Sequence, residues 1–370
     1  MINILMLNVT SETGGGPIVC DILTKQVDPL SFKLYYVATD NGPYYEKIRK
    51  NVTAIFDINL RKISISNLIK LINLIKTNNI DIIHSHGRAA GVYSRILGIL
   101  LRKKVIHTFH GIHYNNYKNL IKRKAVMVIE NIMAAWSYNI FVSNGERKSA
   151  EEMGLTNFLK SSRTILNGID LKRFDKVKES LYKEKIQILT LSQISYHKGL
   201  DILVDAVKYL VENGVTNFEM IIAGDCIPQN ISFKMSLQET IDTYQLHPYI
   251  KLIGIVENSE EILMKSDIYI SASRGEGLPL SLIEAMASGT LVVASDVVGN
   301  NDIIKNGENG YLISIKDFNS ELKQLLVNYR QNEKENSKMI FKAKEDVNAY
   351  DSIRMVNEYE VVYKKLIINN

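Results

Sequence analysis

The chain has 370 residues, of which 46% are hydrophobic and 23% charged, and its formal net charge is +5. This composition excludes a disordered or fibrous protein, and the length predicts two domains or three small ones. Two cysteines, Cys20 and Cys226, are too few for a disulfide framework and indicate a reducing compartment. No segment has the roughly 18–20 apolar residues that a membrane-spanning helix needs. The first residues form a predicted strand rather than a signal peptide, so we expect a cytoplasmic protein.

Short apolar runs alternate with helical patterns along the first half of the chain. We predict strands at 4–7, 34–37, 81–84, 104–107, 140–142 and 164–166. Helices are predicted from Pro17, after a glycine-rich turn, and at 66–76, where leucine and isoleucine recur on one face. Continuous apolar strands that alternate with helices are typical of a parallel sheet covered on both faces.

The same alternation returns after a charge-rich, apolar-poor segment at 170–185, which is typical of a linker. We predict strands at 186–191, 219–223, 250–253, 267–270 and 291–294, and helices at 199–212, 260–265, 281–287 and 352–367. The sequence therefore predicts an α/β protein with two doubly wound, Rossmann-like domains, at 1–175 and 186–351. Ligands of such sheets bind beyond the carboxyl ends of the strands, so the loops that follow strands are the places to examine.

A long basic segment, from 82 to 129, contains no aspartate or glutamate. Its nine basic residues are Arg88, Arg95, Arg102, Lys103, Lys104, Lys118, Lys122, Arg123 and Lys124. Five of the seven histidines lie in it as well. We expect positive potential here, which would suit anionic lipid or an anionic ligand. A merely solvated charged face is the alternative.

A glycine-rich loop, Gly14-Gly15-Gly16, follows the first predicted strand. Glycines let the backbone approach a ligand, and the helix N-terminus behind them favours phosphate. A tight turn that binds nothing is the alternative. The loop lacks the G-x-G-x-x-G pattern, which argues against dinucleotide binding.

Histidines follow two further strands, in the segments 84–88 and 107–113. Structural zinc sites usually include cysteine, and no Cys, Asp or Glu accompanies these histidines, so we favour neutral hydrogen bonding to hydroxyl groups over metal binding. His84 and His107 lie nearest their strands and are expected in the core. His110 is the candidate functional histidine.

The second domain begins with a strand and the segment 192–199, which ends in Lys198-Gly199. A lysine at a helix start can contact phosphate as a point charge. Taken alone, this pattern favours the alternative, a solvated lysine that binds nothing.

Two glutamates, Glu276 and Glu284, lie in the strand–loop–helix segment 273–289. Gly277 frees the loop, Pro279 suits a helix start, and the first N–H groups of the helix can meet an anion. A carboxylate accepts two hydroxyl hydrogens. Two carboxylates beside such a helix start predict a nucleotide diphosphate sugar. The alternative, that Glu284 is a surface residue, fits poorly with its Ala- and Met-rich neighbours.

These segments together resemble the retaining glycosyltransferases of family 4, with the GT-B fold and the E-x7-E signature, known from bacterial polysaccharide and glycolipid assembly. Glu276 to Glu284 matches that signature. The other matching elements, in chain order, are Gly14–Gly16, His107–Gly111, Leu166–Asp170 with Phe174, Lys198-Gly199 and Asn309–Leu312. The resemblance implies two domains that face each other across a cleft, with the C-terminal helix, 352–370, packed back on the first.

The resemblance also implies roles for individual residues. His110, Lys198 and Glu276 would be catalytic, and Glu284 would hold the ribose hydroxyls. The residues implied to contact the donor are Gly15, Gly16, Gln193, Lys198, Val256, Glu276, Gly277, Leu278, Leu280 and Glu284. One departure stands out: Gln193 occupies the position where the family usually has arginine. Loss of that charge would lower the rate about 10- to 100-fold unless another cation compensates.

The function implied is transfer of a sugar, with retention, from a nucleotide diphosphate sugar, UDP-sugar favoured, to a hydroxyl of a glycan or lipid-linked acceptor. Neither a metal nor another cofactor is expected, because no D-x-D follows a strand and Lys198 with the helix dipole would serve instead. No nucleic-acid partner is expected, whereas the basic segment 82–129 would dock on the inner face of an anionic membrane. A catalytically weak sugar-nucleotide binder and a GT-B sugar-nucleotide epimerase remain the alternatives.

Overall fold

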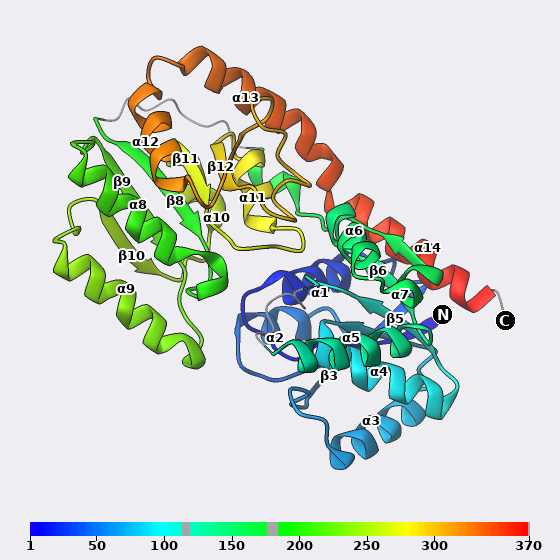
Figure 1. Cartoon of the computed structure of the whole chain (residues 1–370). Coiled ribbons are helices and arrows are strands. Elements are labelled where there is room, and N and C mark those ends of the chain that lie inside the picture. Colours follow the sequence, from blue (N-terminus) through cyan, green and yellow to red (C-terminus); the bar gives the residue numbers. More distant parts are fainter. Residues whose placement is uncertain (113–118, 176–183, 369–370) are drawn as a thin grey trace. The chain divides into compact units, whose positions relative to one another are not determined.

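The computed structural model describes residues 1–112, 119–175 and 184–368. They form two compact units, one comprising Met1–Gly168 with Ser352–Asn370 and the other Ile169–Asp351 (Figure 1). Helix α14 (Ser352–Ile368) therefore belongs to the first unit, although it follows the second in sequence. His113 and Lys118, and the centre of the expected linker, lie outside the described residues.

The first unit contains a parallel sheet with the strand order β3-β2-β1-β4-β5-β6-β7. The strands are β1 (Ile2–Leu7), β2 (Phe32–Ala38), β3 (Ala54–Asp57), β4 (Ile82–His86), β5 (Lys104–Thr108), β6 (Tyr138–Phe141) and β7 (Ser162–Thr164). The strand order reverses between β1 and β4, and a doubly wound sheet binds ligands at such a point.

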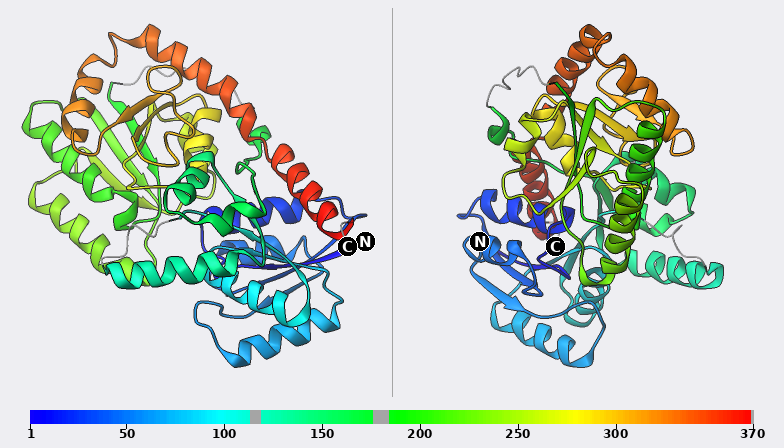
Figure 2. Two further views of the ribbon diagram at one scale, coloured as in Figure 1. Left: turned by 45° about the vertical axis from the view of Figure 1, so that its right-hand side comes forward. Right: turned by 90° about the vertical axis from the view of Figure 1, so that its left-hand side faces the viewer.

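Helices cover both faces of this sheet, as its two-sided apolar strands require. They are α1 (Gly15–Gln26), α2 (Pro43–Arg49), α3 (Ile65–Thr77), α4 (Arg88–Leu101), α5 (Leu120–Ala134), α6 (Asn144–Glu152), α7 (Thr156–Lys160) and α14. Ile4 and Met6 of β1 pack with α1 and α14, whereas Leu5 and Leu7 pack with α3 and α4. Figure 2 shows α14 running beside α1.

The second unit contains a parallel sheet with the order β10-β9-β8-β11-β12-β13. Its strands are β8 (Ile186–Leu191), β9 (Phe218–Ala223), β10 (Ile250–Gly254), β11 (Ile268–Ser271), β12 (Leu291–Ser295) and β13 (Tyr311–Ile313). Its helices are α8 (Leu200–Glu212), α9 (Ile231–Thr243), α10 (Ser259–Met264), α11 (Leu280–Ala287), α12 (Phe318–Asn328) and α13 (Glu333–Asp346). Short 3-10 turns are η2 (Leu171–Phe174), η3 (Tyr196–Lys198), η4 (Pro228–Asn230) and η5 (Val347–Tyr350).

The predicted α/β class with two Rossmann-like sheets is confirmed. The short strands β3 and β13 were not predicted, because they are only partly buried and carry a weak apolar signal. The first helix begins at Gly15, with Gly14 at the capping position, close to the start predicted at about Pro17. Among the described residues, no helix combines the length and the apolar character required to cross a bilayer.

Candidate functional site

Two predicted site residues of the second unit contact each other at the carboxyl edge of its sheet. Lys198 follows β8 and Glu276 follows the neighbouring β11, and Lys198 Nζ lies 2.7 Å from Glu276 Oε1. Ser273 donates a hydrogen bond of 2.6 Å to the same oxygen. Burial alone would raise the pKa of Glu276, but the Lys198 ammonium and the Ser273 hydroxyl bring that pKa below its usual value. Glu276 is therefore ionised and held in one orientation.

Two glycines allow this close approach of loops. Gly199 has a φ of +68°, and a Cβ there would lie 1.9 Å from the carbonyl oxygen of Ala272. Gly299 has a φ of +92°, and a Cβ there would lie 2.6 Å from the Glu276 Cβ. The Glu276 N–H donates to the Val298 carbonyl at 2.9 Å, so the loop after β12 fixes the backbone of Glu276.

The loop that holds Glu276 leads directly into α11, whose N-terminus suits an anion. Pro279 stands at the cap, no side chain caps the helix, and its first turn contains no acidic residue. The first intrahelical bonds are donated by Leu282 and Ile283 to the Pro279 carbonyl, so the N–H groups of Leu280 and Ser281 precede them. Such N–H groups and the helix dipole favour negative charge.

Glu284, on the same helix, is mostly buried rather than a surface residue, with 16% of its side chain exposed. Arg173 Nη1 lies 3.3 Å from Glu284 Oε1. Arg173 Nη2 contacts Ser259 Oγ at 3.1 Å and Glu260 Oε2 at 2.5 Å. Burial raises the pKa of Glu284, Arg173 and the Ser259 hydroxyl lower it, and the Glu260 charge raises it again, with a net rise. Arg173, Ser259 and Glu260 were not among the predicted site residues.

Gln193 and Val256, also predicted to contact the donor, lie in loops after β8 and β10 and are partly exposed. Within the described part of the chain, the Gln193 amide makes no side-chain hydrogen bond. Arg274, a cation near Lys198, is engaged by Asp201 in a two-pronged ion pair at 2.9 and 2.6 Å. Its guanidinium also lies 3.8 Å from the centre of the Tyr196 ring. In this arrangement Arg274 does not replace the arginine that Gln193 stands for.

The first unit brings the glycine-rich loop and His110 together. A Cβ on Gly16 would lie 3.6 Å from Cδ2 of His110, whereas Gly15 faces open space. A hydrogen bond of 3.0 Å joins His86 Nδ1 to His110 Nε2, and their rings stack. Burial lowers the pKa of His110 to about 4 and that of His86 well below its usual value, so both rings are neutral near pH 7.

The remaining nitrogens of this histidine pair are available for a ligand. His86 Nε2 and His110 Nδ1 are buried, and neither has a hydrogen-bond partner among the described residues. Whichever ring donates the shared proton, one of these nitrogens is a donor and the other an acceptor. A neutral pair of this kind suits a hydroxyl group better than an anion.

His84 and His107 lie in the core, as their positions in the sequence predict. His84 is joined to the Tyr363 hydroxyl and to Thr108 Oγ1, each at 2.8 Å. The ring of His107 packs so closely on α4 that a Cβ at Gly91 would lie 2.4 Å from it.

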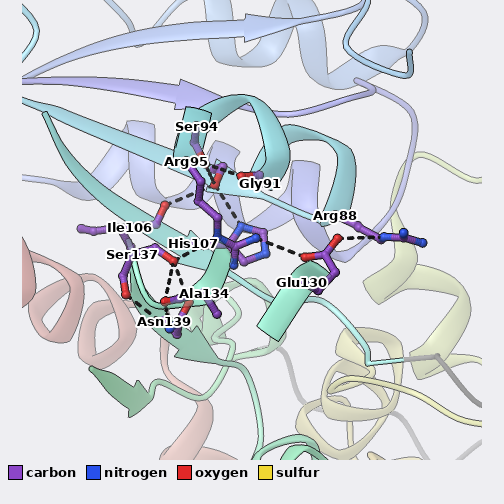
Figure 3. Close-up of polar contacts among 11 residues, drawn as sticks. Arg88, Gly91, Ser94, Arg95, Ile106, His107, Glu130, Ala134, Ser137 and Asn139 are labelled. Atoms are coloured by element: carbon purple, nitrogen blue, oxygen red, sulfur yellow. Dashed lines mark hydrogen bonds and ion pairs between the residues drawn. The ribbon is translucent and has the colours of Figure 1, made fainter. Parts of the chain in front are cut away.

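The basic segment is less exposed than its sequence suggests. Arg95 is fully buried between α4 and α5, where it contacts Glu130 Oε2 at 3.2 Å (Figure 3). Arg88 contacts the other oxygen of Glu130 at 2.9 Å. Glu130 is the first acidic residue after the segment 82–129, and its carboxylate contacts both arginines. The expectation that Arg95 adds to a positive surface potential is therefore wrong.

Comparison with known proteins decides the family. The model for Glycosyltransferase Family 4 matches residues 13–173, and the model for Glycosyl transferases group 1 matches residues 172–346. The chain belongs to the family 4, group 1 glycosyltransferases. Both matched ranges lie on the elements from which the resemblance was inferred.

This glycosyltransferase has relatives along most of its length. It is 26% identical over 354 residues to the UDP-Gal:alpha-D-GlcNAc-diphosphoundecaprenol alpha-1,3-galactosyltransferase of Escherichia coli, covering 91% of this chain and 90% of that protein. It is 25% identical over 277 residues to the capsular polysaccharide biosynthesis glycosyltransferase CapH of Staphylococcus aureus, covering 74% and 75%.

Solved structures share its fold. Anabaena HepE in complex with UDP-glucose matches with a TM-score of 0.86 and 16% identity, over 99% of this chain and 100% of that one. A glycosyltransferase from Rickettsia africae matches with a TM-score of 0.82 and 22% identity, over 100% and 99%. At these identities the likeness shows the fold, which for this glycosyltransferase is GT-B.

The candidate site residues of the glycosyltransferase form one group in each unit. Gly16 and His110 lie together in the first unit, with His86 as an addition. Lys198 and Glu276 lie together in the second, and Glu284 is joined to Arg173. Arg173 lies within the matched N-G-I-D…F element, which was the one signal in the sequence that could have pointed to it.

Proposed function

We propose that the chain transfers a hexose from a nucleoside diphosphate sugar, with UDP-sugar favoured, to a hydroxyl of a glycan or lipid-linked acceptor. The observation that supports this most is the Lys198–Glu276 ion pair beside the uncapped start of α11. It combines a cation and backbone donors for a diphosphate with an oriented carboxylate for sugar hydroxyls.

In the proposed reaction the bond between the anomeric carbon and the diphosphate oxygen breaks, and that oxygen keeps the electron pair. The acceptor oxygen bonds to the same carbon from the departing face, so the configuration is retained. The acceptor proton passes to the leaving phosphate. Lys198 and the N–H groups of α11 stabilise the charge that develops, and this transfer needs no metal.

The names of similar proteins support the choice of donor and acceptor. The E. coli relative is named for a UDP-galactose donor and a lipid diphosphate acceptor. HepE has a structure with UDP-glucose. From these names we propose for this chain a UDP-sugar donor and a lipid-linked acceptor. The proposal does not include galactose as the sugar.

A thermal-shift series with UDP-, GDP- and ADP-sugars tests the donor, because a ligand that binds the folded state raises its melting temperature. We expect the largest rise with a UDP-sugar. The anomeric configuration of the product, measured from the NMR coupling constant of its anomeric proton, tests retention. Turnover after EDTA treatment tests metal independence. No shift with any of the three sugar nucleotides would contradict the proposal.

The uncharged Gln193 favours a second candidate, a catalytically weak protein that binds the sugar nucleotide. Under that alternative the donor would stabilise the chain without turnover with any acceptor. Gln193→Arg separates the two: if the missing charge limits the rate, turnover should rise about tenfold. Loss of activity would show that glutamine serves another role. Donor consumption without an acceptor would instead indicate an epimerase.

We also propose that α5 docks on an anionic membrane. Its exposed apolar residues, together with Trp136 just beyond it, recur at helical spacing along one face: Ile121, Val128, Ile129, Ile132 and Trp136. Each is at least half exposed. Lys122 and Lys124, both exposed, flank this apolar stripe at the N-terminal end of the helix, whereas Arg123 is half-buried on the side of Glu130 and Ala134. An apolar face bordered by cations is typical of helices that lie in a lipid interface.

A further inference from the structure

Arg173 lies against the carboxylate that is proposed to hold the ribose. It comes from η2, which follows the N-G-I-D element directly. The Asp170 carboxylate caps this turn by accepting the Lys172 N–H at 3.2 Å, and the buried Phe174 anchors it. Arg173 and Glu284 are 111 positions apart in sequence, so two separate family motifs meet at one ion pair.

The guanidinium is divided between two carboxylates. Its Nη1 contacts Glu284 Oε1, whereas its Nη2 is held by Ser259 Oγ and Glu260 Oε2 of α10. Because Glu260 and Ser259 fix Nη2, the side chain keeps little rotational freedom. An ionised carboxylate has about four acceptor positions. Contact with Nη1 uses one of them and the Ser259 hydroxyl uses another, so two acceptor positions remain for two hydroxyl groups.

Glu284 needs a counter-ion if it is to accept two hydrogen bonds. The carboxyl is mostly buried, and the second carboxylate, Glu260, lies nearby. Burial and a like charge both favour the protonated acid, which accepts fewer hydrogen bonds. Arg173 opposes both effects.

We propose that Arg173 is a positioning residue for the donor. It keeps the Glu284 carboxylate ionised and aimed so that the two neighbouring hydroxyls of a nucleotide ribose can both donate to it. Arg173 acts through Glu284 and touches neither the sugar nor the diphosphate. This inference rests on the proposed function, since it needs a nucleotide whose ribose meets Glu284.

Calorimetric titration of the whole chain with UDP tests the proposal. We expect Arg173→Gln to weaken UDP binding about tenfold, as does loss of a charge-assisted bond, and Arg173→Lys to recover part of the loss. Glu284→Gln should weaken binding at least as much. The double variant should bind no more weakly than Glu284→Gln alone, because residues that act through each other are not additive. Arg330→Gln, an exposed arginine of the same unit, is the control and should leave the affinity unchanged.

A second ligand separates a positioning role from a structural one. With 2′,3′-dideoxy-UDP, which lacks both ribose hydroxyls, Arg173→Gln and the unaltered chain should bind equally. If Arg173→Gln lowers the melting temperature sharply, Arg173→Met, which keeps apolar length over the Phe174 ring, takes its place in both titrations.

The outcomes distinguish the two proposals. If Glu284→Gln leaves UDP affinity unchanged, the ribose role of Glu284 fails, and with it this part of the proposed function. If Glu284→Gln weakens UDP binding while Arg173→Gln leaves UDP binding unchanged or strengthens it, only the role of Arg173 is overturned. Additive losses in the double variant would overturn it equally.

Discussion

The Lys198 ammonium and the Glu276 carboxylate show how a single ion pair can prepare a site. The carboxylate holds the ammonium 2.7 Å away, at the edge of the sheet where α11 also begins with its uncapped N–H groups. An incoming diphosphate would compete with Glu276 for this cation. Because negative charge would develop on the leaving diphosphate as the donor bond breaks, the cation would stabilise the transition state more than the bound donor.

Lys198→Ala should therefore reduce turnover more than binding. We expect kcat to fall about 100- to 1,000-fold, as for loss of one donor to a developing charge, with a smaller change in the affinity for UDP. Lys334→Ala, an exposed lysine on α13, is the matched control. An unaltered kcat in Lys198→Ala would remove Lys198 from the mechanism.

Gly199 is a residue whose backbone conformation sets the position of Lys198. Gly199→Ala should cost roughly 2–4 kcal/mol of unfolding free energy, because the left-handed conformation and a clash with the Ala272 carbonyl act together. Gly214→Ala is the comparison, since Gly214 has a similar φ of +76° and open space around it. That change should cost only about 1–2 kcal/mol. Denaturant unfolding of both variants measures the difference, and equal losses would refute the clash.

The buried histidines of the first unit make its stability depend on pH. Burial lowers the pKa of His84 to about 3 and that of His110 to about 4, below the value of 6.5 that an unfolded chain has. Since the unfolded state binds protons first, stability is complete above about pH 6.5 and falls as the pH drops toward 4. Each histidine contributes up to about 1.4 kcal/mol per pH unit.

Denaturant unfolding at pH 7.5, 6.5 and 5.5 measures this dependence. His84→Gln should reduce the slope of unfolding free energy against pH, even if it also lowers stability throughout. A slope that His84→Gln does not change would mean that the ring is protonated in the folded state.

At the scale of elements, α5 exposes a stripe of apolar side chains together with basic ones. Its sequence places an apolar stripe on a face that the unit leaves exposed, while Glu130 and Ala134 turn inward. The usual amphipathic pattern puts the apolar face toward the core. The same helix also presents the exposed Lys122 and Lys124 beside that stripe, the arrangement on which the proposal of membrane docking rests.

Reversing the charges of Lys122, Arg123 and Lys124 to glutamate tests the role of α5. At about 1 kcal/mol for each basic residue near an anionic surface, partitioning onto phosphatidylglycerol vesicles should fall at least about 100-fold. The matched control reverses Lys316, Lys334 and Lys338, three exposed lysines of the second unit. Co-sedimentation measures both variants, and unchanged partitioning of the first would contradict docking through α5.

At the scale of the whole molecule, α14 returns the chain to the first unit. Met355, Val356, Tyr359, Val362 and Tyr363 are buried there against β1, β2 and α1. The hydroxyls of Tyr363 and Tyr359 also join His84 and Thr108. The C-terminal helix therefore completes the core that supports the histidine loops.

Deleting residues 352–370 should unfold the first unit and leave the second folded. Burial of five such side chains amounts to roughly 8–15 kcal/mol, about the whole stability of a domain. Calorimetry should then show loss of one transition and retention of the other. Tyr363→Phe, which removes only the bond to His84, is the mild comparison. Two intact transitions after deletion would show that α14 is dispensable.

The local pattern of apolar residues was enough to predict the two parallel sheets. Strands that are buried on both faces are continuously apolar, and helices that are buried on one face show apolar residues at helical spacing. It was also enough to place Lys198, Glu276 and Glu284 after strands or at a helix start. Partly buried edge strands such as β3 lack that signal, so they were missed.

The amino-acid sequence by itself determined the fold class, the family motifs and the residue types from which a donor site can be built. Only the tertiary structure decided which charges meet: Lys198 with Glu276, Arg173 with Glu284, and Arg95 with Glu130. The physical reason is that an ion pair depends on distance and burial, and neighbouring strands bring together residues that lie far apart along the chain.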